Sequence, residues 1–237
     1  MGLGFVVTEW AAIGPSMRTR AAWAAWARGA TVDAAAQTHA ALPPILRRRI
    51  TPIGQMAFEA AQAAQGAAEA RFVFASRHGE FRRTLSLLET LLGDETVSPA
   101  DFSLSVHNAL MGLLSIWSRN PRGHTTIASG TATFHCALIE AASMLVADTD
   151  TPVLLVFYDE PLPAPYDGFN GAADGALALA LLLKSTGDGA RVSIDARSGE
   201  AAEIAQPLDF IRFLVREEHR ADSRPLRVSS RAQREAA

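Results

Sequence analysis

The sequence predicts a single α/β domain whose sheet is covered by helices on both faces. Short apolar runs, typical of buried strands, alternate along the chain with segments whose apolar residues recur at helical spacing. The 237 residues, 49% of them hydrophobic and 20% charged, are enough to enclose a sizeable core. No internal repeat and no linker divides the sequence. We therefore expect one domain over residues 1–220 and a polar tail over 221–237.

The first third of the chain predicts a strand and two helices. Residues 5–13 (FVVTEWAAI) are rich in residues that favour strands, and a short helix is expected around 20–28. Leu42-Pro43-Pro44 interrupts the pattern, because proline cannot donate a backbone hydrogen bond. Thr51 then has the character of an N-cap, with Pro52 at the first helical position. The helix that follows presents a face of small residues, which suits close packing against a sheet.

The middle third predicts a second buried strand and two more helices. The run RFVFAS at 71–76 is apolar and has polar neighbours. Leucines at helical spacing over 85–92 predict a helix that ends at Gly93. Residues 98–101 (SPAD) are expected to form a turn, and 106–117 resume a helical pattern.

The last third predicts the remaining strands of the sheet. In order, we expect a strand at 125–127, a turn at 129–130, a helix over 132–146, a buried strand at 152–158, a strand at 175–183 and a late amphipathic helix around 210–214. A further strand at 191–196 is expected to pair with 175–183 as a hairpin across Gly187-Asp188-Gly189.

Composition excludes several functional classes. The net charge of −3 and the pI of about 6.1 offer no basic field for nucleic acid, and no apolar stretch is long enough to predict a membrane span. Cys136 is the only cysteine, so an intramolecular disulfide is excluded, and His39, His124 and His219 lack the spacing of metal ligands. The N-terminus lacks the pattern of a signal peptide. We expect a cytoplasmic protein without metal or cofactor and without nucleic-acid or membrane partners.

The segment over 125–146 has the layout of a nucleophile elbow. A strand leads through a tight Ser129-Gly130 turn into a helix. Such a turn exposes one side chain at a helix N-terminus, where backbone N–H groups favour a thiolate or an oxyanion. Strand–turn–helix units are common, so this pattern alone does not establish a catalytic site.

Four ordered blocks of the sequence resemble a known family. They are FVFASRHGE (72–80), SPADFSLSVHNALMG (98–112), TTIASGTATFHCALIEAA (125–142) and PVLLVFYDEPLP (152–163). Together they resemble the N-terminal half of β-ketoacyl synthases, and more narrowly the short members known as chain-length factors. The resemblance spans residues 5–185 and implies a thiolase-like fold with a mixed sheet, as a single domain of the N-terminal-half type.

The resemblance also implies that the nucleophile is missing. When Ala137, Glu140 and Ala141 are placed on the family's helix positions, Thr131 stands where the catalytic cysteine belongs. Cys136 follows five residues later, so it should face another direction. The family's two catalytic histidines belong to a C-terminal half whose motifs are absent from this sequence. A threonine hydroxyl without a strong base is a poor acyl acceptor, so we expect no catalysis by this chain alone.

The implied function is that of a partner subunit. The resemblance implies a heterodimer with a full-length ketosynthase, joined along the strand at 125–127, in which this chain helps to set acyl chain length. The pathway would be fatty-acid-like or of the type II polyketide class, such as aryl polyene synthesis. Acyl carrier protein is the second implied partner, and the basic run Arg47-Arg48-Arg49 is its candidate docking site. A merely solvated basic face is an equally good interpretation of that run.

Each candidate residue also has a purely structural interpretation. Thr131 could cap the following helix, and Cys136 could be a small core residue. His107 and Asn108, with Ser129 and Phe134, are candidates for the interface or the acyl pocket, although a structural hydrogen-bonding role for His107 is favoured. His78 is expected to anchor a loop. Asp159-Glu160, directly before Pro161, is expected to set a loop rather than to form a catalytic carboxylate pair.

Two alternative functions remain open at this point. In the first, the chain acts alone on acyl thioesters, as an acyltransferase or a hydrolase, through Ser129, Thr131 or Cys136. In the second, it is a homodimeric scaffold that binds carrier protein without a ketosynthase.

Overall fold

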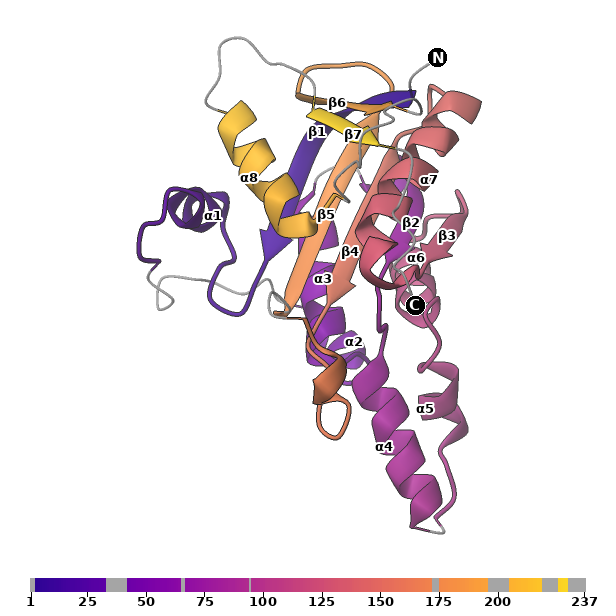
Figure 1. Ribbon diagram of the computed structural model, residues 1–237. Coiled ribbons are helices and arrows are strands. Elements are labelled where there is room, and N and C mark those ends of the chain that lie inside the picture. Colours follow the sequence, from indigo (N-terminus) through magenta and orange to yellow (C-terminus); the bar gives the residue numbers. More distant parts are fainter. Residues whose placement is uncertain are drawn as a thin grey trace.

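A seven-stranded sheet forms the centre of the described structure (Figure 1). The computed structural model describes residues 3–32, 42–64, 67–93, 95–171, 175–195, 205–218 and 226–229. Its strands are β1 (Leu3–Ile13), β2 (Arg71–Ala75), β3 (His124–Ile127), β4 (Val153–Asp159), β5 (Leu177–Lys184), β6 (Ala190–Asp195) and β7 (Leu226–Ser229). They are arranged in the order β3-β2-β4-β5-β1-β6-β7.

Helices cover both faces of this sheet, as predicted. The described helices are α1 (Arg20–Ala27), α2 (Pro44–Arg47), α3 (Pro52–Ala63), α4 (Phe81–Leu92), α5 (Pro99–Ser103), α6 (Ala109–Ser118), α7 (Thr133–Ala147) and α8 (Pro207–Glu217). Short 3-10 turns occupy Ala67–Glu69, Gly130–Ala132 and Asp167–Phe169. Helices α1, α7 and α8 cover one face, and α2, α3 and α6 cover the other.

The sheet is mixed, which agrees with the expected architecture. Strand β2 is parallel to both β3 and β4, whereas β5 is antiparallel to both β4 and β1. The strand predicted next to the elbow, β3, is the edge strand in this order, and within the described ranges it pairs with β2 alone.

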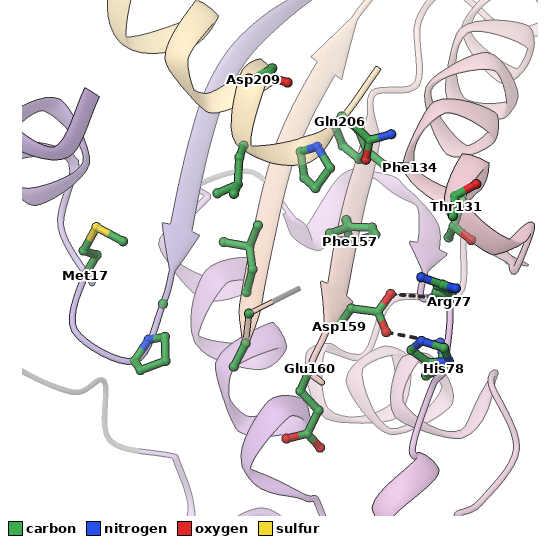
Figure 2. A pocket seen from close by; sticks show the side chains of 18 of the residues that line it. Met17, Arg77, His78, Thr131, Phe134, Phe157, Asp159, Glu160, Gln206 and Asp209 are labelled. Carbon is green, nitrogen blue, oxygen red and sulfur yellow. Dashed lines mark hydrogen bonds between the residues drawn. The ribbon is translucent and has the colours of Figure 1, made fainter. Parts of the chain in front are cut away.

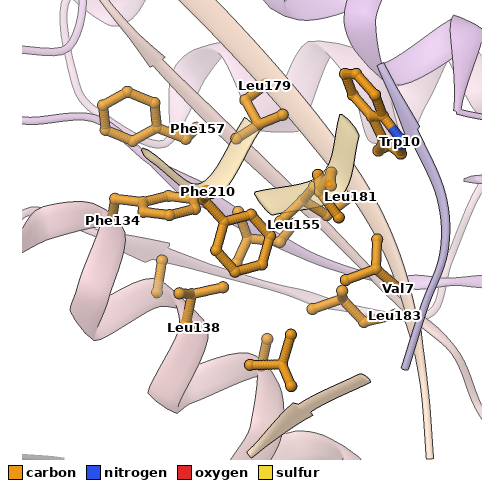
Figure 3. Close-up of a cluster of buried hydrophobic side chains, with 14 of the residues drawn as sticks. Val7, Trp10, Phe134, Leu138, Leu155, Phe157, Leu179, Leu181, Leu183 and Phe210 are labelled. Carbon is orange, nitrogen blue, oxygen red and sulfur yellow. The ribbon is translucent and has the colours of Figure 1, made fainter. Parts of the chain in front are cut away.

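The larger core lies between the sheet and α7, with α8 and α1 closing it (Figure 3). Phe134 of α7 is at its centre and meets Phe157 of β4 and Phe210 of α8 edge-to-face, with ring centroids 5.6 and 5.4 Å apart. Such edge-to-face contacts add to the free energy of burying the rings. These rings hold α7, β4 and α8 in fixed positions around the elbow.

The second core depends on the small residues of α3. The helix begins as predicted, because the Thr51 side chain accepts a hydrogen bond from the Gly54 N–H (3.3 Å) and Pro52 occupies the first turn. Ala57 and Ala60 are completely buried, and they allow α3 to lie close to β4 and β5. Phe58, also completely buried, fills the space towards α6.

The predicted hairpin of β5 and β6 is wrong. Strand β1 lies between them and pairs antiparallel with both. At the turn before β6, a Cβ on Gly189 would lie 2.1 Å from the Val7 carbonyl oxygen, so only glycine permits this approach of β1. A bulge in β1 at Thr8 also changes the register, which turns Val7 and Trp10 towards the same core.

Two smaller predictions also need correction. Residues 98–101 are not a plain turn: residues 99–101 begin the short helix α5, and the Ser98 side chain caps it by accepting a hydrogen bond from the Asp101 N–H. The polar tail expected from residue 221 contains β7, which pairs in parallel with β6. Apart from β7, the residues of that tail lie outside the described ranges, as do His39 and His219.

Candidate functional site

The predicted elbow is present between β3 and α7. Gly130 adopts a positive φ of 54°, which turns the chain sharply after Ser129. The Thr133 hydroxyl closes the turn: it accepts a hydrogen bond from the Ser129 N–H (2.8 Å) and donates one to the Gly130 carbonyl (2.7 Å). The predicted capping role of Thr131 is wrong, because Ala132 occupies the N-cap position of α7 without a side-chain bond. Thr131 is left exposed beside the turn.

Thr131 lies at the rim of a cavity of about 650 Å³ (Figure 2). The lining residues come from seven parts of the chain: Gly14, Pro15, Met17; Trp23, Trp26; Arg77, His78; Gly130, Thr131, Thr133, Phe134; Phe157, Asp159, Glu160; Gly175, Ala176, Leu177; and Gln206, Pro207, Leu208, Asp209, Arg212. The structure thus brings Thr131 and Phe134 together in one cavity. Ser129, His107 and Asn108, predicted as members of the same group, do not line it.

Cys136 is not the core residue that was expected. It is only partly buried, its Sγ lies 3.4 Å from the Ser129 hydroxyl oxygen, and it is not among the residues that line the cavity. His135, its neighbour in sequence, is completely buried, and its Nδ1 accepts a hydrogen bond from the Ala205 N–H (3.2 Å). As predicted, the two side chains point apart and form no cysteine–histidine pair.

Asp159 sets the loop that follows β2. Its carboxylate accepts hydrogen bonds from the Arg77 N–H (2.6 Å), the His78 N–H (3.1 Å) and the Ser76 hydroxyl (3.2 Å). Burial raises the pKa of Asp159 from 3.8 to about 6, although these three hydrogen bonds oppose the shift. The loop-setting interpretation of Asp159 therefore agrees with the geometry. The neighbouring Glu160 pairs with Arg82, with Nε and Oε2 2.9 Å apart.

His107 packs against the loop that follows β2. Its ring lies against Gly79, where an added Cβ would be only 3.2 Å from three ring atoms, and where φ is +61°. The Nε2 atom of His107 is buried and has no hydrogen-bond partner among the described residues. His78 belongs to the loop that Asp159 holds, which agrees with its expected role as an anchor.

Glu80 is a buried carboxyl group that the sequence pattern did not reveal. Only 4% of it is exposed, and burial raises its pKa, while the hydrogen bond with Thr51 and the charge of Arg83 oppose the shift. Arg83 in turn reaches Asp101 (2.6 Å) and the Arg49 carbonyl (2.7 Å). Arg83 therefore links α4 to α5 and to the loop before α3, and it is not part of a basic surface. Arg47, Arg48 and Arg49, in contrast, are exposed.

Exposed apolar side chains gather near the β3 edge and on α4 and α5. We call α4 and α5 (residues 81–103) the arm, because the two helices project together beyond the sheet (Figure 1). Leu91 and Leu92 of α4 are 58% and 87% exposed, and Phe102 of α5 is 65% exposed. On α6, Ile116 is 77% exposed. Each of these large apolar side chains is therefore mostly open to solvent in the described part of the structure.

Two further properties of the described residues bear on function. No group of three or more His, Cys, Asp or Glu side chains lies close enough among them to hold a metal ion.

The segment Gly130–Ala147 is long and apolar enough to resemble a membrane span, but half of it is buried inside the fold and it contains the core helix α7. Its apolar character is explained by the packing of α7 on the sheet.

Comparisons with known proteins agree with this geometry. The family model for the β-ketoacyl synthase N-terminal domain matches residues 23–227. No curated protein matches the chain. A structure of the ketosynthase ApeO in complex with its chain length factor ApeC, from Xenorhabdus doucetiae, contains a chain that is 27% identical, with a TM-score of 0.73 and with 90% of this chain and 92% of that chain covered.

Two more distant structures share the fold. The ishigamide ketosynthase/chain length factor is 17% identical, with a TM-score of 0.61, and the match covers 84% of this chain and 63% of that one. A type II polyketide synthase complex, AntDE with the carrier protein AntF, is 14% identical, with a TM-score of 0.62 and coverages of 77% and 62%. In both cases this chain spans less than two thirds of the matched chain.

Proposed function

This chain belongs to the β-ketoacyl synthase family, as a member built on its N-terminal domain, and we propose that it is the non-catalytic, chain-length-factor-like partner of a ketosynthase. It serves a fatty-acid-like or type II polyketide pathway of the aryl polyene kind. The observation that carries this proposal is a complete elbow with a threonine in the nucleophile position, in a chain that matches nearly the whole length of a chain from a ketosynthase–chain length factor complex.

The chemistry of the elbow supports a role without catalysis. Gly130 and Thr133 keep the turn in shape, so the fold has not lost the elbow itself. Thr131 offers a hydroxyl group, which needs an adjacent base to become a nucleophile. His135, the histidine nearest to it in sequence, is turned away and bound to Ala205. In our proposal the elbow therefore has a structural role: it connects β3 to α7 and performs no chemistry.

The partner surface runs from the β3 edge over α6 to the arm. Among the described strands, β3 pairs only with β2, so in our proposal its outer edge receives a strand of the partner subunit. Ile116 and Trp117 lie on the neighbouring helix and are 77% and 41% exposed. Large apolar side chains around an open strand edge are typical of a surface that is covered in an assembly. The ketosynthase covers this surface in our proposal.

Carrier protein docks on the basic run of α2 and the residues after it. Arg47, Arg48 and Arg49 are all exposed, and their side chains have no ion pair with the described carboxylates. A cluster of free cations would attract an acidic carrier protein and raise its association rate.

Co-purification with the ketosynthase tests the pairing. We expect the wild-type chain and a co-expressed full-length ketosynthase from the same organism to elute as one complex. Ile116→Arg should weaken that complex at least about tenfold, because a charge would be buried in an apolar contact. Ile45→Arg is the matched control, since Ile45 is 69% exposed on α2, outside the proposed surface. Equal affinities for the two variants, or no complex with wild type, would contradict the proposal.

Two further measurements test the chemistry and the docking. Thr131→Cys should react faster with an alkylating agent than wild type, yet sustain no condensation without a ketosynthase. Sustained turnover would restore the alternative of an independent enzyme.

The double variant Arg47→Glu, Arg48→Glu should slow carrier-protein association at low salt more than at high salt. Arg122→Glu, at an exposed arginine elsewhere, is the control.

A further inference from the structure

A buried carboxyl group lies where the arm joins the rest of the fold. Glu80 is the residue before α4, yet its side chain makes no cap on that helix. Its carboxylate lies instead at the first turn of α3, where Thr51 donates a hydrogen bond to it and where a Cβ on Gly54 would be 3.2 Å from Oε1. Only 4% of Glu80 is exposed. The beginning of the arm is therefore joined to α3 through a group that titrates.

The cation nearest to Glu80 makes its hydrogen bonds elsewhere. Arg83 Nε lies 4.0 Å from Oε2 of Glu80, too far for a hydrogen bond. The two terminal nitrogens of Arg83 bind the Asp101 carboxylate (2.6 Å) and the Arg49 carbonyl (2.7 Å). Oε1 of Glu80 is buried and has no hydrogen-bond partner among the described residues. Because a buried carboxylate is stable only when it is paired and hydrogen-bonded, these surroundings favour the neutral form.

The other polar neighbours of Glu80 come from the end of β4 and from the turn before α6. Glu160 repels a negative charge on Glu80, and it is itself paired with Arg82. Tyr158 is 1% exposed, and its hydroxyl has no hydrogen-bond partner among the described residues. The His107 ring packs on the residue before Glu80. A protonated Glu80 has an O–H to donate, and the Tyr158 hydroxyl is an acceptor that it reaches directly or through one water molecule.

From the geometry of this junction we infer that Glu80 is a proton-dependent contact, which holds the arm most firmly while it is protonated and loosens the arm when it ionises. The inference goes beyond the proposed function, because it concerns the isolated chain and no part of it needs a ketosynthase. Pairing can therefore fail while this contact operates, and the reverse also holds.

The direction of the pH effect follows from the burial of Glu80. Burial raises its pKa above the ordinary 4.5, although the hydrogen bonds of Thr51 and the charge of Arg83 oppose the shift. When the arm detaches, Glu80 enters water and returns to its ordinary pKa. The attached arm thus binds the proton more tightly than the detached arm does. The contribution of Glu80 to attachment is full below pH 4.5 and is lost as the pH rises through the higher pKa of the attached state.

The test follows the end of the arm in the isolated full chain. Leu92 is the last residue of α4 and is 87% exposed, so Leu92→Cys in a Cys136→Ala background provides one thiol for a fluorophore that does not respond to pH. Fluorescence anisotropy then reports how freely the arm moves. We expect the anisotropy to fall as the pH rises, with a midpoint above 4.5. Circular dichroism at each pH checks that the fold is intact.

Four variants in this labelled background assign the transition. Glu80→Gln has nearly the same size and is permanently neutral, so its anisotropy should stay high and the transition should be lost. Glu89→Gln is the matched control, an exposed carboxylate of the same helix, and it should retain the transition. Asp159→Asn and His107→Gln should also retain it, which separates Glu80 from the other titrating groups around the loop.

The wild-type profile tests the inference without any change at Glu80. A flat profile, or a midpoint at or below 4.5, would overturn it. A transition that persists in folded Glu80→Gln would also overturn it, because the proton would then belong to another group. Loss of the transition in Asp159→Asn or in His107→Gln, with Glu80→Gln unaffected, would assign the proton to that residue instead.

Discussion

Helices α3 and α4 have the same length of 12 residues but very different surroundings. Eight residues of α3 are buried, including Ala57 and Phe58, and they pack on β4, β5 and β1. No residue of α4 is buried, although its leucines are gathered on one side of the helix, as the spacing of 85–92 predicted. Leu91 and Leu92 are mostly exposed to solvent.

The difference shows what an amphipathic pattern does and does not encode. Apolar residues at helical spacing indicate that a helix face will be covered. They do not indicate whether the covering surface belongs to the same chain. Helix α3 is covered within this fold. The arm that contains α4 is held at its base by the ion pair of Arg83 with Asp101 and by the edge-to-face contact of Phe81 with Tyr166, and Leu91 and Leu92 stay exposed.

The largest expected effect compares the two helices directly. Phe58→Ala should lower the free energy of unfolding by about 3–5 kcal/mol, because it leaves a cavity at a completely buried position. Leu91→Ala should change it by no more than about 0.5 kcal/mol in the isolated chain. Denaturant titration of both variants gives the comparison. A loss of several kcal/mol for Leu91→Ala would show that α4 does have a partner within the chain.

The next effect concerns how α4 is attached. Arg83 is only 13% exposed and holds Asp101 and the Arg49 carbonyl, so Arg83→Met should cost about 1–3 kcal/mol of unfolding free energy. Its neighbour Arg82 is 52% exposed and pairs only with Glu160 among the described residues, so Arg82→Met should cost less than about 1 kcal/mol. Unfolding measured under identical conditions should separate the two. Equal losses of unfolding free energy for the two variants would mean that the contacts of Arg83 do not stabilise the base of α4 more than the exposed pair of Arg82 does.

A smaller effect should follow pH, through the loop that leads into α4. Burial raises the pKa of Asp159 to about 6, so the folded protein binds this proton more tightly than the unfolded chain does. The contribution of Asp159 to stability is therefore greatest below about pH 4 and is lost as the pH rises to about 6. Unfolding free energies at about pH 4.5 and pH 7 should differ less for Asp159→Asn than for wild type. An unchanged difference would assign the pH dependence to other groups, such as Glu80.

The smallest effect is expected at Cys136. The side chain is only partly buried, and its one described contact is the 3.4 Å approach to the Ser129 hydroxyl. Cys136→Ala should therefore change the unfolding free energy by less than about 1 kcal/mol and leave the yield of the ketosynthase complex unchanged. Loss of product in a variant that still folds and pairs would identify Cys136 as a catalytic group.

Short sequence patterns predicted most of the helices and strands, but they did not predict which strands pair with each other. The Thr51-Pro52 start of α3, the Gly93 stop of α4 and the turn at Gly130 depend on nearby residues, and all three are present. The place of β1 between β5 and β6 could not be predicted, because it depends on contacts between the two ends of the chain. The nearest signal was Gly189, which lies against the Val7 carbonyl.

The sequence predicted the part of the candidate site that lies at the elbow, but not the part that comes from α1. The sequence placed Thr131 at the turn and named Phe134 as a pocket candidate, and both residues line the same cavity. The wall formed by Trp23 and Trp26 was missed, because nothing in an alanine- and tryptophan-rich helix indicates which distant loop it will face. Asp159 was interpreted correctly because the pair Asp159-Glu160 comes at the end of a buried strand and directly before Pro161, a pattern typical of a strand that leads into a fixed loop.

The strand order has a consequence for synthesis on the ribosome. Strand β1 is made first, yet both of its neighbours, β5 and β6, lie beyond residue 176. The nascent chain therefore carries an apolar N-terminal strand with two open edges until most of the protein has emerged, and pairing across such long sequence separations is slow. During that interval β1 can be captured by another chain or held by a chaperone. The central part of the sheet can form only after β5 and β6 have been synthesised and have paired with the eleven-residue strand β1.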